Sequence, residues 1–152
     1  MAIAQTVTTS FKVQLLQAVH NFGPTSPNTF KVALFTAAAN LTANTTAYTV
    51  GMTGEVANGS GYTTGGNTLV ISISPTSANN SLSIPTAFIS FSNTSWTNAT
   101  FTARGALIYN DSVAGDPSVA VLDFGSDKTV NNDTFQIIFP TADANSAIVR
   151  IS

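Results

Sequence analysis

The chain has 152 residues, of which 43% are hydrophobic and only 8% are charged, with a formal net charge of −2 and no cysteine. The length predicts a single domain, and the lack of cysteine excludes disulfides, thiolate metal sites and cysteine nucleophiles. The chain is too apolar for disorder, and no apolar run approaches the roughly 20 residues of a membrane helix. The net charge gives no attraction to nucleic-acid phosphates. We therefore expect neither a nucleic-acid partner nor a membrane partner.

Most of the polar residues are Thr, Ser and Asn, so the predicted surface consists of neutral hydrogen-bonding groups. Little charge repulsion then opposes self-association, which is typical of a chain that sits in an assembly. A neutral domain that works alone is the alternative. The opening residues, Met1 to Gln5, lack the basic and apolar regions of a secretory signal.

The N-terminal part predicts an arm and a helix. Residues 1–9 are expected to form an extended arm or a first strand, and Ser10 is the expected N-cap of a helix that reaches about Phe22. Gly23 and Pro24 would end this helix. The only histidine, His20, would lie in its last turn, where it interacts favourably with the helix C-terminus and is not a catalytic base. The predicted apolar face contains Phe11, Leu15, Leu16, Val19 and Phe22.

The middle of the chain predicts short strands around one long loop. Residues 29–36 alternate as a strand with one strongly apolar face, and residues 68–74 and 87–91 are further strands. Residues 75–84 read as a turn or loop. Residues 42–67 are dense in Gly, Thr and Asn and predict a long loop, which would hold one or two short strands or reach toward a neighbour.

A hairpin over residues 95–124 is the strongest strand signal, with a polar loop at residues 111–117 between its two runs. Its strands would pair Arg104 with Asp123, and Arg150 would need a carboxylate partner if it were buried. The predictions that complete the C-terminal part are a turn at residues 123–128 and strands at 134–139 and 146–151. The whole is mainly β: one antiparallel, jelly-roll-like β-sandwich over residues 1–152, with about eight strands and one N-terminal helix.

No catalytic, cofactor-binding or metal-ligating residue is predicted, so the chain is expected not to be an enzyme. A single histidine and one glutamate cannot supply a zinc site or the usual catalytic arrangements. Two pairs of turn carboxylates, Asp111 with Asp116 and Asp123 with Asp127, are expected to be solvated, with calcium as the alternative. The four large polar aromatic residues could form a sugar-stacking platform, but core or interface packing is favoured for Tyr48, Tyr62, Trp96 and Tyr109.

Several short runs, which together span nearly the whole chain, resemble one family. They are Thr8 to Lys12, Phe30 to Leu34, Ser95 to Asn110, Val119 to Thr129, Phe139-Pro140 and Ile148 to Ile151. In these runs the chain resembles the small virion structural proteins of tailed bacteriophages. The resemblance implies a virion component and supplies no active-site residues.

We therefore expect a non-enzymatic bacteriophage structural protein, first of all a capsid decoration (cement) protein that forms a homotrimer and binds the major capsid protein. It would be found in the virion, after assembly in the bacterial host cytoplasm. One alternative is a component associated with the tail, baseplate or fibre, with tail proteins as partners. Another is a carbohydrate-binding receptor module.

Overall fold

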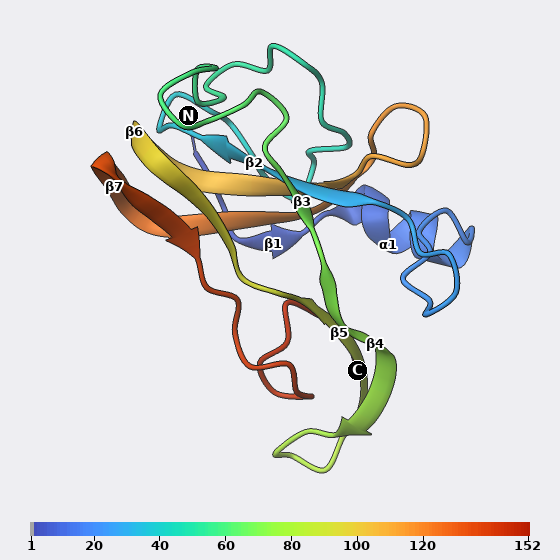
Figure 1. Cartoon of the computed structure of the whole chain (residues 1–152). Coiled ribbons are helices and arrows are strands. Elements are labelled where there is room, and N and C mark those ends of the chain that lie inside the picture. The colour runs from blue at the N-terminus through green and yellow to red at the C-terminus, as the bar shows by residue number, and fades with distance from the viewer. Residues whose placement is uncertain (1) are drawn as a thin grey trace.

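The computed structural model describes residues 2–152, and these form eight strands in two antiparallel sheets together with one short N-terminal helix (Figure 1). Strand accounts for 49% of the chain and helix for 5%. The predicted β-sandwich class is confirmed. The elements are β1 (Thr6–Val7), α1 (Thr9–Leu16), β2 (Phe30–Phe35), β3 (Asn67–Leu69), β4 (Ile71–Asn79), β5 (Pro85–Phe91), β6 (Thr94–Asn110), β7 (Ser118–Ile137) and β8 (Val149–Ile151).

A long hairpin, β6–β7, is the central part of the larger sheet. The five-stranded sheet has the order β1-β7-β6-β2-β3, and the three-stranded sheet has the order β4-β5-β8. β2 pairs only with the C-terminal part of β6, from Gly105 to Asn110, so the rest of the hairpin extends past β2. The hairpin curves there (Figure 1), where Asn98, Gly125 and Asn132 have positive φ and the pairing register shifts. Such bulges bend a strand pair, so the hairpin curves while both of its strands stay in the five-stranded sheet.

The predicted turn at residues 123–128 is wrong, and so is a separate strand at 134–139. Residues 123–128 and 134–137 belong to β7, which continues to Ile137 because β6 offers pairing partners along almost its whole length. Gly125 supplies the left-handed backbone conformation (φ 75°) that the bulge needs without ending the strand. Residues 123–128 therefore have the composition of a turn but form a bend within β7.

Residues 68–84 also differ from the prediction. The expected strand at 68–74 is two strands in different sheets, with the exposed Val70 between β3 and β4. The expected loop at 75–84 begins only at Asn80, because β4 runs through Pro75. β4 is an edge strand, and its register shifts between Ile73 and Thr76, which is where a proline is tolerated in a sheet.

The helix is shorter than predicted. Its N-cap is Thr8, not Ser10, and it ends at Leu16 because Ala18 adopts a left-handed conformation (φ 57°). The Val19 N–H donates to the Gln14 carbonyl and the Ala18 N–H to the Leu15 carbonyl, which is a Schellman ending without its usual glycine. Phe22 therefore lies beyond the helix, where its ring packs edge-on against Phe11 at 6.0 Å.

Two apolar clusters cover opposite faces of the five-stranded sheet. The main core between the sheets contains Phe30, Val32 and Leu34 of β2, with Phe91, Trp96, Ile108 and Phe135 among its other members. The second, which we call the loop-covered face, lies under residues 36–66, the ordered loop at the top of Figure 1. Its members are Ala33, Phe35, Ala39, Leu41, Tyr48, Leu107, Tyr109 and Val121. β2 is consequently buried on both faces, where one was expected.

The two segments predicted to reach outward lie against the domain itself. Ile3 packs on the loop-covered face and forms a bridge with Leu41, and β1 pairs with β7, so the first-strand alternative for residues 1–9 is the correct one. The long loop contains only isolated bridges, among them Phe35 with Glu55 and Ala47 with Pro117. It folds back over its own sheet.

Candidate interaction surface

The four polar aromatic residues are all buried. Trp96 and Tyr48 are 4% exposed, Tyr62 is 2% exposed and Tyr109 is 1% exposed. Tyr48 stacks on Tyr109 at 4.4 Å within the loop-covered face, whereas Trp96 packs against Phe135 in the main core. Core packing is therefore confirmed for these side chains, and they form no sugar-stacking platform.

Glu55, the only glutamate, is the centre of a polar network that the sequence did not reveal. Its two carboxylate oxygens accept hydrogen bonds from the hydroxyls of Tyr48 and Tyr62, each at 2.9 Å, and one also accepts from the Gly65 N–H at 2.7 Å. The Tyr109 hydroxyl donates to the Gly65 carbonyl at 2.7 Å. Burial raises the pKa of all three tyrosines, so their hydroxyls stay protonated and donate. The network fastens the loop to the sheet.

His20 does not lie at the helix C-terminus, because the helix ends before it. It is 7% exposed and packs against Phe11 at 4.8 Å. Its Nε2 donates to Gln14 Oε1 at 3.0 Å and its Nδ1 accepts from Asn110 Nδ2 at 3.1 Å, in the tautomer that satisfies both partners. Burial lowers the pKa of His20 from 6.5 to about 4. The neutral ring links the end of α1 to the end of β6, so His20 has a structural role.

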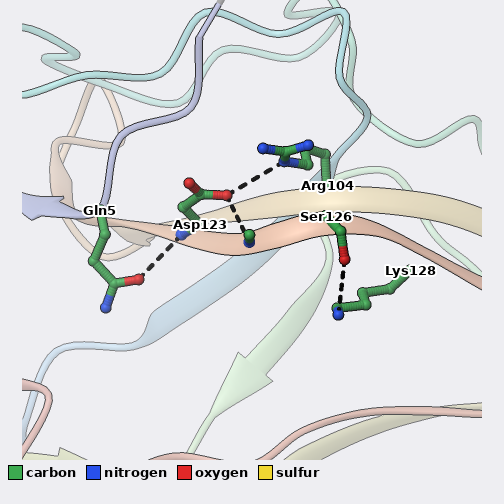
Figure 2. A network of polar contacts seen from close by, with 6 residues as sticks. Gln5, Arg104, Asp123, Ser126 and Lys128 are labelled. Carbon is green, nitrogen blue, oxygen red and sulfur yellow. Dashed lines mark hydrogen bonds and ion pairs between the residues drawn. The ribbon is translucent and has the colours of Figure 1, made fainter.

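The predicted pairing of Arg104 with Asp123 is confirmed, at 3.4 Å from Nε to Oδ1 (Figure 2). Asp123 Oδ1 also accepts from the Gly125 N–H at 2.8 Å, and the Asp123 N–H donates to Gln5 Oε1 at 3.2 Å. Asp111 pairs with Lys31 at 3.3 Å. Across residues 2–152, no three His, Asp or Glu side chains gather where they could hold a metal ion.

Residues of α1 and β8 line an uncovered, mainly apolar groove, which we call the α1–β8 groove. One part has a volume of 590 Å³, and a second, apolar part of 130 Å³ adjoins it between α1 and β5. Phe11, Leu15, Val149 and Ile151 line both parts. Beside it Leu16 is 92% exposed and Val13 is 52% exposed, so these apolar side chains of the helix are not covered by any part of residues 2–152.

Two strand edges border this groove. β8 pairs with β5 on one side and β1 pairs with β7 on one side, and among residues 2–152 no backbone hydrogen bond joins either strand to a partner on its other side. Val7 of β1 lines the groove together with the residues of β8. A region that combines exposed apolar side chains with unpaired backbone groups is suited to binding another chain.

The free positive charges of the described chain lie at the same place. Of the five Lys and Arg residues, Lys31 and Arg104 form ion pairs, and Lys128 donates to Ser126 Oγ at 3.0 Å (Figure 2). Lys12 on α1 and Arg150 on β8 are exposed, and within residues 2–152 their side chains have no ion-pair or hydrogen-bond partner. No Asp or Glu lines the groove.

Searches with this chain found no matching protein-family model, no matching curated protein and no matching solved structure. Within residues 2–152, no helix has the length and apolar character needed to span a bilayer.

Proposed function

We propose that this chain is a non-enzymatic structural protein of a bacteriophage virion, specifically a capsid decoration protein that acts as a homotrimer on the major capsid protein. The observation that carries the proposal is the α1–β8 groove, where exposed Leu16 and Ile151 adjoin two unpaired strand edges. Contiguous apolar surface of this kind marks sites where chains meet. The few charges of the chain and its short-run resemblance to virion proteins support the same reading.

The mechanism is adhesion. A protein that binds only the assembled shell stabilises that shell by mass action, since every bound copy must be released before the shell comes apart. Many copies on a symmetric lattice add avidity without new contacts. The rigid part of this mechanism is the sandwich, whose loop and N-terminal strand are fastened to their own sheet, and the part that binds is the groove.

The test adds the purified protein to shells that lack it and measures the temperature at which the genome is released. We expect this temperature to rise and then to level off at saturation, and no rise at saturation would overturn the proposal. The copy number per particle, measured by quantitative mass spectrometry, separates a capsid from a tail location. A decoration protein is present in hundreds of copies, whereas a tail, baseplate or fibre component is present in about a dozen or fewer.

A further inference from the structure

We propose that the α1–β8 groove binds an extended segment of a partner protein, which adds to the free edge of β8 as a further strand and carries an acidic side chain between two apolar ones. This inference rests on the proposed function, because it describes how the groove would bind the partner protein. Three features of the groove lead to it: the free strand edge, the alternation of β8 and the distribution of charge.

The strand edge supplies the backbone part of the binding. β8 uses one side to pair with β5, in the register Ala87 with Ile151 and Ile89 with Val149. Its other side faces the groove toward β1, whose outer edge is also unpaired. An extended peptide that enters there can satisfy these backbone groups, and peptide recognition by added strands works in this way.

The alternation of β8 fixes the side chains that the added strand must carry. Val149 and Ile151 line the groove. Arg150 lies between them and also borders the groove, but it is paired with Phe88, which packs in a separate cluster with Ala144 and Ala147. Since side chains directly across from one another in neighbouring strands lie on the same face, apolar residues are needed opposite Val149 and Ile151. The residue of the added strand that lies between these two is next to Arg150, and we expect it to be Asp or Glu.

The charge distribution favours a different chain over a second copy in a two-fold arrangement. In an isologous contact that pairs β8 of one copy with β8 of another, Arg150 of one copy would approach Arg150 of the other. Like charges across a strand pair are destabilising, and no Asp or Glu within the groove would compensate. A partner segment with Asp or Glu opposite Arg150 replaces this repulsion with an attractive pair.

The experiment uses a synthetic probe of defined sequence, Thr-Val-Asp-Val-Thr-Val-Asp-Val-Thr with blocked ends, and measures its binding to the full chain by fluorescence anisotropy. Three matched probes replace Asp by Lys, replace Val by Ser, or carry N-methyl groups at alternate backbone nitrogens. We expect the Asp probe to bind about fivefold more tightly than the Lys probe, because one favourable cross-strand pair replaces a repulsive one. We expect the Ser and N-methylated probes to lose binding.

The variant Arg150→Glu should reverse the preference between the Asp and Lys probes, whereas Lys128→Glu, at a cation remote from the groove, should leave it unchanged. Both side chains are exposed, so neither change is expected to alter the melting temperature. Absence of any binding of the Asp probe, equal binding of the Asp and Lys probes, or full binding of the N-methylated probe would overturn the inference. Displacement of all probes alike by dodecanoate would also overturn it, since the groove would then be a site for small amphiphiles.

The shell assay separates the two proposals. If the Arg150→Glu variant binds the Asp and Lys probes with the same affinities as the wild-type chain, and both proteins stabilise shells, the inference fails and the proposed function stands. If the probes behave as expected but the wild-type chain does not stabilise shells, the decoration role fails and the strand-binding site stands.

Discussion

The loop-covered face and the α1–β8 groove are both apolar surfaces that lie beside an irregular segment of chain. The first is covered by that segment, and the second is left exposed. On the loop-covered face, residues 36–66 fold back over the sheet, and Glu55 ties Tyr48, Tyr62 and Gly65 together. At the groove, α1 ends at Leu16, and the residues after it turn away to pack on Phe11. A long polar loop can cover the apolar face of its own sheet, whereas a helix of two turns leaves apolar side chains such as Leu16 exposed.

Truncating one leucine in each region gives the largest expected difference between them. Leu107 is fully buried in the loop-covered face, so Leu107→Ala should lower the free energy of unfolding by about 3 kcal/mol. Leu16 is 92% exposed, so the matched change Leu16→Ala should stay within about 0.5 kcal/mol. Urea unfolding measures both. Equal costs at the two positions would show that the groove is part of the closed core.

A second prediction concerns the polar fastening of the loop. Glu55→Ala removes the acceptor of two tyrosine hydroxyls and of the Gly65 N–H, so the free energy of unfolding should fall by about 2 kcal/mol. The control is Asp133→Ala, which removes an exposed carboxylate whose hydrogen bond is to the neighbouring Thr134 N–H. Hydrogen exchange should show faster exchange in residues 55–66 of the Glu55 variant alone. A loop that stays fully protected in that variant would contradict the role given to Glu55.

The third and smallest effect depends on pH. His20 is neutral in the folded chain with a pKa of about 4, and its ordinary value is 6.5, so the unfolded chain binds the proton first as the pH falls. The stability that this residue contributes is fully present above pH 6.5 and is lost progressively toward pH 4, by about 1 to 2 kcal/mol at pH 5. Urea unfolding at pH 7 and pH 5 should show a smaller loss in His20→Gln than in the wild-type chain. An equal loss in both would exclude His20 as the source.

Much of the fold was predictable where the local pattern and the tertiary pairing agree. Residues 95–110 alternate over a long apolar run that ends in a loop with Gly and Pro, and the strand there is β6 within one residue. The pairing of Arg104 with Asp123 followed from that hairpin. Prediction failed where pairing overrides composition: residues 123–128 look like a turn, but β6 provides partners that carry the strand through them.

The site was less predictable, because it depends on an early helix ending. The periodicity through Phe22 favours a longer helix, yet Ala18 ends it without the glycine that usually signals such a cap. The longer helix places Leu16 on a buried apolar face, so the sequence did not predict an exposed groove beside it. The Val149-Arg150-Ile151 alternation was visible in the sequence, but only the sheet order shows that β8 is an edge.

The β6–β7 hairpin also has a consequence for how the protein forms. β2 is made early in synthesis. β3 pairs with three of its residues, but all six pair with β6, and β6 in turn pairs with β7, which ends at Ile137. Contacts so distant in sequence slow the folding of β proteins. The pairing of β2 with β6 therefore cannot be complete until most of the chain has left the ribosome, and the apolar residues of β2 are a source of aggregation until then.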